Sequence, residues 1–174
     1  MKEILSHTEF QTKVTELSDR LLKHHPDTKE VVFIGIQQGG VVLADELMEA
    51  MKQSSPEARI QYGKLDITFY RDDIRRKMLA PDTMHIPFSI ENKTVILIDD
   101  VLFTGRTIKA ALDVLLDYGR PAKVELCVLV DRKEHRQFPI QADYVGLTLT
   151  TGTQDKIKLV KGGDGKKHVI LLPV

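Results

Sequence analysis

Two adjacent carboxylates and a threonine-rich turn lie close together in the middle of the chain. Asp99 and Asp100 follow a run of four apolar residues, and the tetrad Thr-Gly-Arg-Thr, from Thr104 to Thr107, comes shortly after them. A helix N-terminus has unsatisfied backbone N–H groups and a positive dipole end, so a helix that begins at this tetrad would bind a 5′-phosphate. Carboxylates accept hydrogen bonds from ribose hydroxyls or from water on a metal ion. The segment therefore predicts a ribose phosphate site.

Other nucleotide-binding motifs fit these residues less well. A Walker P-loop needs Gly at position 100 and Lys at position 106, where the chain has Asp100 and Arg106. Residues 35–40 are not a dinucleotide fingerprint, because position 37 is Gln. Each part alone has an ordinary structural explanation: Thr104 as a helix N-cap, and the acids as a solvated pair at a strand end. Their occurrence within thirteen residues favours the ribose phosphate site.

The apolar pattern predicts the strands that lead to these residues. Residues 31–36 and 95–98 are continuous, largely β-branched apolar runs, which are typical of strands buried on both faces of a parallel sheet. Residues 65–70 alternate between apolar and polar side chains, which predicts a half-exposed strand near a sheet edge. Further strands are expected at 124–130 and near 143–147, 156–160 and 168–172.

Helical spacings of three and four residues fall between these strands. A first helix is expected over residues 7–23, after a capping box formed by Ser6 and Glu9. A second is expected over about 41–51, and a third after Thr107. The alternation predicts an α/β fold with a mostly parallel, twisted sheet flanked by helices. Such sheets bind ligands at the carboxyl ends of their strands, where the paired acids fall.

Composition excludes several classes of function. The 174 residues carry 25 basic and 25 acidic side chains, so no net charge draws the protein toward nucleic acid or a membrane surface. The single cysteine, Cys127, lies in an apolar run and is expected to be a buried structural thiol. No stretch approaches the ~20 apolar residues that a membrane helix needs. We therefore expect a single domain over residues 1–174, in a cytoplasmic protein with no membrane partner.

Several stretches of the chain together resemble a known family. Residues 95–107 resemble the signature of type I phosphoribosyltransferases. The chain is also similar, nearly end to end, to the family of bifunctional pyrimidine operon regulators and uracil phosphoribosyltransferases. The most specific further stretches are residues 65–73, 118–122, 128–132 and 139–146. The resemblance implies a type I fold, in which a small hood region covers the parallel sheet.

The resemblance also implies a reaction, in which 5-phosphoribosyl-1-pyrophosphate and uracil give UMP and pyrophosphate. Mg²⁺ is the implied cofactor, carried by the substrate and bridged through water to Asp99 and Asp100, with no direct protein ligand. Arg71 begins a charged loop expected over residues 71–87 and matches a position that can fold over the pyrophosphate. We expect Asp99, Asp100 and Arg71 to act in catalysis. Substrate binding is expected for Gln38, Gly39, Gly40, Val101, Leu102, Phe103, Thr104, Gly105, Arg106, Thr107, Arg132 and Ile157.

Two positions bear on the substrates. Purine-specific members of the resembled family place an Asp before the Thr-Gly pair, where this chain has Phe103, which cannot ionise and so favours a pyrimidine base. In the loop that resembles the family's pyrophosphate loop, Gly39 replaces an Arg, so a phosphate-binding cation is missing. The replacement would either weaken the binding of 5-phosphoribosyl-1-pyrophosphate or leave phosphate binding to Arg71 or Arg106. The altered loop leaves open a phosphoribosyltransferase for a different base.

The main alternative to the enzyme is an RNA-binding pyrimidine operon regulator that senses UMP or UTP with little or no catalysis. Basic residues of the resembled family are replaced by Gln141 and Leu147, and one extra residue follows Arg132. RNA binding depends on Lys and Arg at phosphates, so these changes argue against RNA as a partner. A homodimer or higher oligomer is implied by the family likeness only. Basic runs remain at residues 23–25, 75–77 and 166–168.

Overall fold

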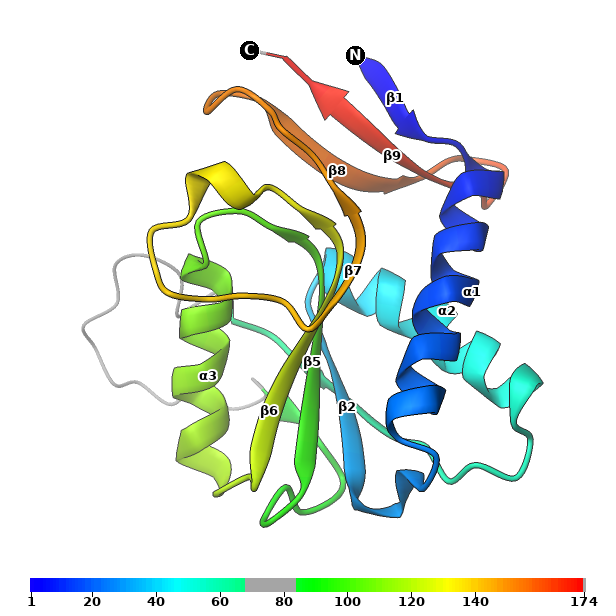
Figure 1. Cartoon of the computed structure of the whole chain (residues 1–174), viewed down its shortest axis with the longest axis vertical. Helices are drawn as coiled ribbons and strands as arrows, with labels where there is room; N and C mark the ends of the chain where they lie inside the picture. The colour runs from blue at the N-terminus through cyan, green and yellow to red at the C-terminus, as the bar shows by residue number, and fades with distance from the viewer. Residues whose placement is uncertain (68–83, 174) are drawn as a thin grey trace.

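The larger of two sheets forms the centre of the molecule in a computed structural model that describes residues 1–67 and 84–173 (Figure 1). Its strand order is β4-β3-β2-β5-β6-β7. All neighbouring strands are parallel except β4, which pairs antiparallel with β3. The strands are β2 (Val31–Ile36), β3 (Gln61–Leu65), β4 (Met84–His85), β5 (Thr94–Leu102), β6 (Lys123–Asp131) and β7 (Tyr144–Thr148).

The two ends of the chain together form a second, antiparallel sheet with the order β1-β9-β8. Its strands are β1 (Lys2–Leu5), β8 (Lys156–Lys161) and β9 (Lys167–Leu172). This sheet lies over the carboxyl ends of the parallel strands, at the top of Figure 1. It is the hood that the family resemblance implied, although β1 itself was not expected from the sequence.

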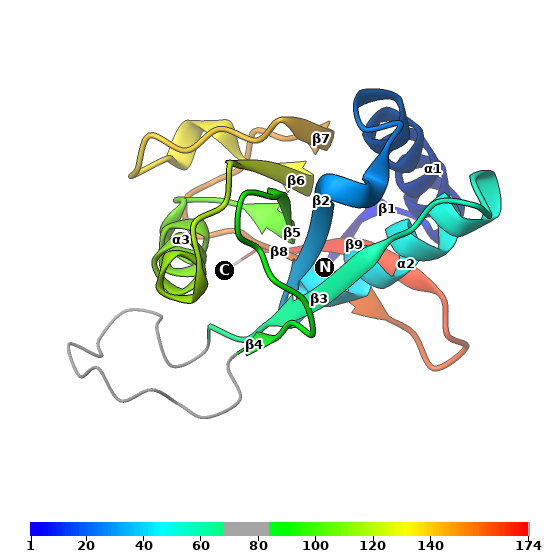
Figure 2. The same cartoon turned by 90° about the horizontal axis from the view of Figure 1, so that it is seen from below.

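In the described part of the chain, three helices cover the two faces of the larger sheet (Figures 1 and 2). Helices α1 (His7–His24) and α2 (Gly39–Ser54) pack on one face, and α3 (Arg106–Tyr118) packs on the other. Two short 3₁₀ segments, η1 (Thr28–Glu30) and η2 (Lys133–His135), lie in connections. None of the helices among the described residues is long and apolar enough to span a membrane. The predicted α/β fold, with a mostly parallel sheet flanked by helices, is confirmed.

Alternate residues of the central strands enter different halves of the core. Phe33 and Ile98 pack with α1 and α2, whereas Ile34 and Leu97 pack with α3. Both faces are covered, so these strands need apolar residues at every position, which explains their continuous apolar runs. Each fully buried side chain of this size stabilises the fold by about 1.5–3 kcal/mol relative to its exposed state. Cys127 lies in this core as expected, and burial raises the pKa of its thiol to about 12.

Local signals account for the ends of α1. The Ser6 side chain accepts a hydrogen bond from the Glu9 backbone N–H, and the Glu9 carboxylate accepts one from the Ser6 N–H, so the predicted capping box is confirmed. The helix ends at His24, one residue beyond the expected range of 7–23. Helix α2 begins at Gly39 and ends at Ser54, so it is longer at both ends than the expected range of 41–51.

The strand expected at residues 65–70 is wrong at residues 66 and 67, which are not in a strand, while residues 68–70 lie outside the described residues. Strand β3 spans Gln61–Leu65 and therefore ends where that strand was expected to begin. It lies parallel to β2 with Ile36 opposite Leu65, so both strands leave the sheet at the same level. Nor is β3 an edge strand, because β4 pairs with its other side. Residues 84–85, expected within a loop over 71–87, form β4, while Arg71 lies outside the described residues.

Candidate active site

Strand β5 brings the two acids to the carboxyl end of the sheet. It continues through Asp99 and Asp100 to Leu102, so the acids lie within the strand and not after residue 98 as expected. The Asp99 carboxylate accepts a hydrogen bond from the Asp100 backbone N–H, and the Asp100 carboxylate accepts one from the Val101 N–H, each at 2.9 Å. These bonds orient both carboxylates through the backbone of the strand.

The Thr-Gly-Arg-Thr tetrad forms the start of α3, as predicted. Gly105 is the N-cap and has a φ of 91°, a left-handed conformation that is costly for residues with a Cβ. Thr104 lies one residue before the N-cap, and its hydroxyl accepts a hydrogen bond from the Arg106 N–H at 3.3 Å. The suggestion that Thr104 itself caps the helix is therefore wrong, because the chain turns at Gly105. The helix still presents its N-terminus beside the acids of β5.

Residues 137–138 contact this turn and stabilise it. The Gln137 N–H donates to the Thr104 carbonyl at 2.8 Å, and the Arg106 Nε donates to the Gln137 side chain at 2.8 Å. The Arg106 guanidinium also lies 5.7 Å from the centroid of the Phe138 ring. Arg106 is thus directed at the 137–138 segment and does not line the cavity described below.

The loop before α2 approaches the acids closely. The peptide bond between Gln37 and Gln38 is cis. A Cβ at Gly40 would lie 2.4 Å from the carbonyl oxygen of Ile98, and a Cβ at Gly39 would lie 2.1 Å from a carboxylate oxygen of Asp100. Glycine at both positions is what allows this contact, so an Arg at position 39 would require the Asp100 carboxylate to move.

The loop, the acids and the hood enclose a cavity of about 560 Å³. It is lined by nine residues that were expected to act in the site, from three separate stretches of the chain and the hood. These are Gln38, Gly39, Asp99, Asp100, Val101, Phe103, Thr107, Arg132 and Ile157.

The remaining expected residues lie elsewhere. Gly40 and Leu102 are buried against neighbouring backbone and core, and the tetrad residues from Thr104 to Arg106 are not among the lining residues. Arg71 lies outside the described residues. Four lining residues were not expected, namely Gln37, Asp155, Lys156 and Lys158. Gln37 could have been found in the sequence because it is adjacent to Gln38. No local sequence pattern indicates that the other three line a cavity, and they lie there because β8 and the residue before it belong to the hood region.

Phe103 and Arg132 form one wall of this cavity. The Arg132 guanidinium lies 3.8 Å from the centroid of the Phe103 ring. Only 2% of the Arg132 surface is exposed, and burial lowers the pKa of its guanidinium although the nearby charges of Glu134 and Asp155 oppose this shift. The pair places an aromatic ring and a cation in the cavity wall that also holds the acids. Such a wall suits a planar ring, whereas the acids and the α3 N-terminus suit a sugar phosphate.

Fold and site together define a class of protein: an α/β protein with a cavity at the carboxyl end of a parallel sheet whose residues suit a ribose phosphate and a planar base. Comparison with known proteins narrows this class. Residues 1–161 match the phosphoribosyl transferase domain. The chain therefore belongs to the phosphoribosyltransferase family and is an enzyme that transfers a pentosyl group.

Relatives called bifunctional protein PyrR resemble the chain over nearly its whole length. The protein from Chloroflexus aurantiacus is 40% identical over 98% of this chain and 94% of its own. The protein from Geobacter sp. strain M21 is 42% identical over 97% of this chain and 96% of its own.

Solved structures agree on the fold. A hypoxanthine phosphoribosyltransferase of Trypanosoma cruzi has a TM-score of 0.71 at 19% identity and covers 99% of this chain, which covers 97% of that chain in turn. A hypoxanthine phosphoribosyltransferase from Staphylococcus aureus has a TM-score of 0.67 at 24% identity, and the match covers 86% of this chain and 77% of that chain. At such identities the likeness establishes the type I phosphoribosyltransferase fold and no base preference.

Proposed function

We propose that this phosphoribosyltransferase joins uracil to the ribose 5-phosphate of 5-phosphoribosyl-1-pyrophosphate, releasing pyrophosphate. The observation that carries the proposal is the single cavity in which the Phe103 and Arg132 wall stands beside Asp99 and Asp100. Phe103 precedes the Thr-Gly pair, where it provides an apolar ring and no ionisable group for proton exchange with a purine. The likeness to PyrR proteins supports the same assignment.

In the proposed reaction a bond forms between N1 of uracil and the anomeric carbon while the bond from that carbon to pyrophosphate breaks, and the N1 proton is lost. Positive charge develops on the ribose ring as the pyrophosphate leaves. Asp99 and Asp100 would stabilise this charge and accept hydrogen bonds from the ribose hydroxyls. The N-terminal turn of α3, including Thr107, would hold the 5′-phosphate. The protein then acts chiefly by positioning and electrostatics.

Mg²⁺ is the cofactor that we propose. Oxygen ligands suit this ion, which usually keeps several waters, and two carboxylates facing one cavity fit a hydrated ion carried on the substrate. Asp99 and Asp100 would hold it through water. When bound, the ion would supply positive charge to the departing pyrophosphate.

A base panel tests the proposal. The protein is incubated with Mg²⁺, 5-phosphoribosyl-1-pyrophosphate and, separately, uracil, hypoxanthine, guanine, adenine or orotate, and nucleotide formation is measured. We expect UMP from uracil and at least about tenfold lower kcat/KM for the other bases, which corresponds to ~1.4 kcal/mol of discrimination. If only a purine is converted to its nucleotide, that purine replaces uracil as the proposed substrate. Absence of turnover with every base would reject the enzymatic proposal.

A second candidate is an RNA-binding regulator, favoured by the word bifunctional in the name of the relatives. One of the basic runs gives it little support, because Lys167 pairs with Glu46 and His168 pairs with Glu3, while the run at residues 75–77 lies outside the described residues. RNA binding through phosphates would weaken steeply with salt and would depend on UMP if the cavity is the effector site. Filter binding to the protein's own leader RNA and to an unrelated RNA, with and without UMP, decides between the two roles. Equal affinity for both RNAs would exclude the regulator.

We also propose, from the family likeness alone, a cytoplasmic homodimer or higher oligomer. Sedimentation equilibrium at micromolar protein, with and without nucleotide, measures the mass of the assembly. A monomer of 19.7 kDa under all conditions would contradict this assignment.

A further inference from the structure

A short turn after β6 contacts two parts of the cavity wall at once. The turn consists of Arg132 and the 3₁₀ segment η2 (Lys133–His135). One of the two parts is Phe103, which follows β5. The other is the loop of residues 151–155, which leads from β7 toward the hood strand β8 and ends at the cavity-lining Asp155.

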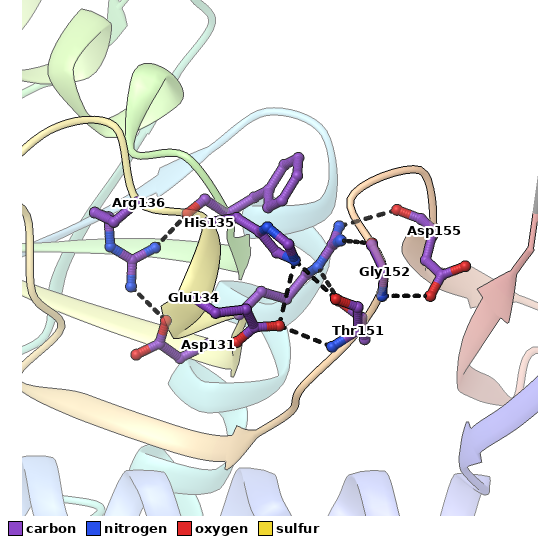
Figure 3. A network of polar contacts seen from close by, with 9 residues as sticks. Asp131, Glu134, His135, Arg136, Thr151, Gly152 and Asp155 are labelled. Atoms are coloured by element: carbon purple, nitrogen blue, oxygen red, sulfur yellow. Dashed lines mark hydrogen bonds and ion pairs between the residues drawn. The ribbon is translucent and has the colours of Figure 1, made fainter.

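Thr151, the first residue of that loop, is bound through all of its polar groups (Figure 3). Its hydroxyl accepts a hydrogen bond from Arg132 Nε at 2.7 Å, and its backbone N–H donates to the Glu134 carboxylate at 2.7 Å. Its carbonyl lies 2.8 Å from His135 Nε2. A carbonyl oxygen only accepts, so His135 Nε2 must carry the hydrogen. Three side chains of one turn therefore fix a single residue in position and orientation.

Arg132 also forms hydrogen bonds with later residues of the loop. Its two terminal nitrogens donate to the carbonyls of Gly152 and Asp155 at 2.8 and 3.0 Å. Within the loop, the Gly152 N–H donates to the Asp155 carboxylate at 2.8 Å. Because Arg132 is almost fully buried, these bonds are shielded from water and stronger than exposed ones. The loop is thus held at its beginning and at its end.

The same turn holds Phe103. The Arg132 guanidinium lies over one face of the Phe103 ring, and the His135 ring meets it edge-on with 5.1 Å between ring centroids. Arg136, the next residue along the chain, donates to the Phe103 carbonyl and forms an ion pair with the buried Asp131. Both the ring and the backbone of Phe103 are therefore positioned from this part of the chain.

We propose that Glu134 and His135 are positioning residues which, with Arg132, hold the 151–155 loop at a set place relative to Phe103 and so form the nucleotide side of the cavity. We name these three residues the β6 clamp. Within this turn, the Glu134 carboxylate accepts the hydrogen bond from the Thr151 N–H at 2.7 Å. That hydrogen bond lowers the pKa of the Glu134 carboxyl, so the acceptor stays charged at neutral pH. This inference rests on the proposed function for its kinetic consequence, but the clamp can be measured without turnover.

The test compares Glu134→Ala, Glu134→Gln and the control Lys133→Ala. Lys133 lies in the same turn and is exposed, and no contact of its side chain enters the clamp. Hydrogen–deuterium exchange of the peptide that contains residues 151–155 reports the loop, and calorimetry reports the affinity for UMP. Loss of one hydrogen bond is worth ~1 kcal/mol, or about a fivefold change. We expect Glu134→Ala to raise loop exchange and the Kd for UMP about fivefold. Gln keeps an accepting oxygen, so Glu134→Gln should recover most of both values.

Kinetics separate positioning from a merely structural role. If uracil is the substrate, Glu134→Ala should raise the KM for uracil about fivefold while the KM for 5-phosphoribosyl-1-pyrophosphate stays within about twofold. Loop exchange in Glu134→Ala equal to that in Lys133→Ala would overturn the clamp, whatever the base panel shows. Faster exchange with unchanged UMP affinity would also overturn it, because the loop would then not shape the site. Failure of uracil turnover in the unaltered protein rejects the proposed base and leaves the exchange result to decide on the clamp.

Discussion

At Gly40 the backbone of α2 approaches β5 closely. A Cβ there would lie 2.4 Å from the Ile98 carbonyl oxygen and 3.0 Å from the Asp99 Cα, both in a strand that is hydrogen-bonded on each side. At Gly39 the neighbour is instead the carboxylate of Asp100, the movable end of a side chain. The two glycines therefore serve different purposes: one lets the helix pack on the sheet, and the other lets a catalytic candidate approach the loop.

We predict that Gly40→Ala destabilises the fold by about 1–3 kcal/mol, because a methyl group at this point overpacks a contact with strand backbone. Urea unfolding of the variant and the unaltered protein measures the difference. Gly163→Ala is the control, since a Cβ there meets nothing within 4 Å and should change stability by less than about 1 kcal/mol. Equal midpoints for both variants would show that the Gly40 contact is relaxed in solution.

For Asp100→Asn we predict a fall in kcat of about 100-fold with a normal fold. Asn keeps the oxygen that accepts from the Val101 N–H but removes the negative charge, and a well-placed electrostatic group is worth about 3 kcal/mol in the transition state. Initial rates with saturating substrates, together with circular dichroism, measure both parts. Asp113→Asn, on the exposed surface of α3 where Asp113 pairs with Lys109, should keep full activity. An Asp100→Asn variant with unchanged kcat would remove Asp100 from the catalytic residues.

At the scale of one element, helix α1 is stabilised by local contacts at its start and by distant contacts at its end. Its start depends on neighbours in the chain, the capping box of Ser6 and Glu9. Its end depends on distant residues, because His25, the C-cap, bonds to the Glu125 carboxylate at 2.5 Å, and the Tyr144 hydroxyl lies within 3.4 Å of the same carboxylate. The helix start could be predicted from sequence for this reason, whereas its link to β6 and β7 could not.

Removing the cap gives a prediction with a defined pH dependence. Ser6→Ala should lower the free energy of unfolding by about 1 kcal/mol at pH 7. The Ser6 backbone and side-chain hydrogen bonds hold the pKa of Glu9 below its usual 4.5, so the Glu9 contribution is present above pH 4.5 and is lost as the pH falls through the lowered value. The difference between variant and unaltered protein should therefore shrink in acid.

Thermal unfolding between pH 3 and pH 7 measures this difference. Thr12→Ala, an exposed change in the interior of the same helix, serves as control and should alter stability by less than about 0.5 kcal/mol at every pH. The variant keeps the bond from the backbone N–H of residue 6 to the Glu9 carboxylate, so a Ser6→Ala difference that stayed constant down to pH 3 would mean that the bond from the Ser6 hydroxyl to this carboxylate adds nothing to the cap.

At the scale of the whole molecule, the hood is attached to the body through a few polar contacts beside its apolar face. Lys167 of β9 forms an ion pair with Glu46 of α2, and Gln11 of α1 donates to the same carboxylate at 3.1 Å. Burial raises the pKa of Glu46, but the bonds from Lys167 and Gln11 outweigh it and leave the pKa lowered. Because residues of β8 and the first residue of α2, Gly39, both line the cavity, this attachment bears on the shape of the site.

We predict that Lys167→Ala costs about 1 kcal/mol of stability and raises the Kd for UMP by at least about twofold, since it frees the hood at a partly buried pair. Calorimetric titration and urea unfolding measure the two effects. Lys166→Ala is the matched control, because its exposed side chain pairs only locally with Asp164 among its described contacts. If both variants bind UMP equally, the pair holds no part of the hood that shapes the cavity.

Much of the secondary structure could be predicted because it depends on residues close in sequence. The apolar runs at β2, β5 and β6 and the helical spacings gave elements near their observed positions, and the site segment from Asp99 to Thr107 is continuous in the chain. Strand β3 was not predicted at Gln61–Leu65, because its bounds are set by pairing with β2, which the alternation of apolar and polar residues from Leu65 onward does not specify. The catalytic role of the acids stays a prediction.

By itself the sequence determined the α/β class, the capped first helix and the start of α3 at the Thr-Gly-Arg-Thr tetrad, since each of these is decided by side chains within a few residues. Only the tertiary structure decided that Asp155, Lys156 and Lys158 line the cavity and that Arg132, Glu134 and His135 grip Thr151. These contacts join segments brought together by strand order and by the closure of the hood from both chain ends. Such pairings follow from packing of the whole molecule, and no local pattern of polarity specifies them.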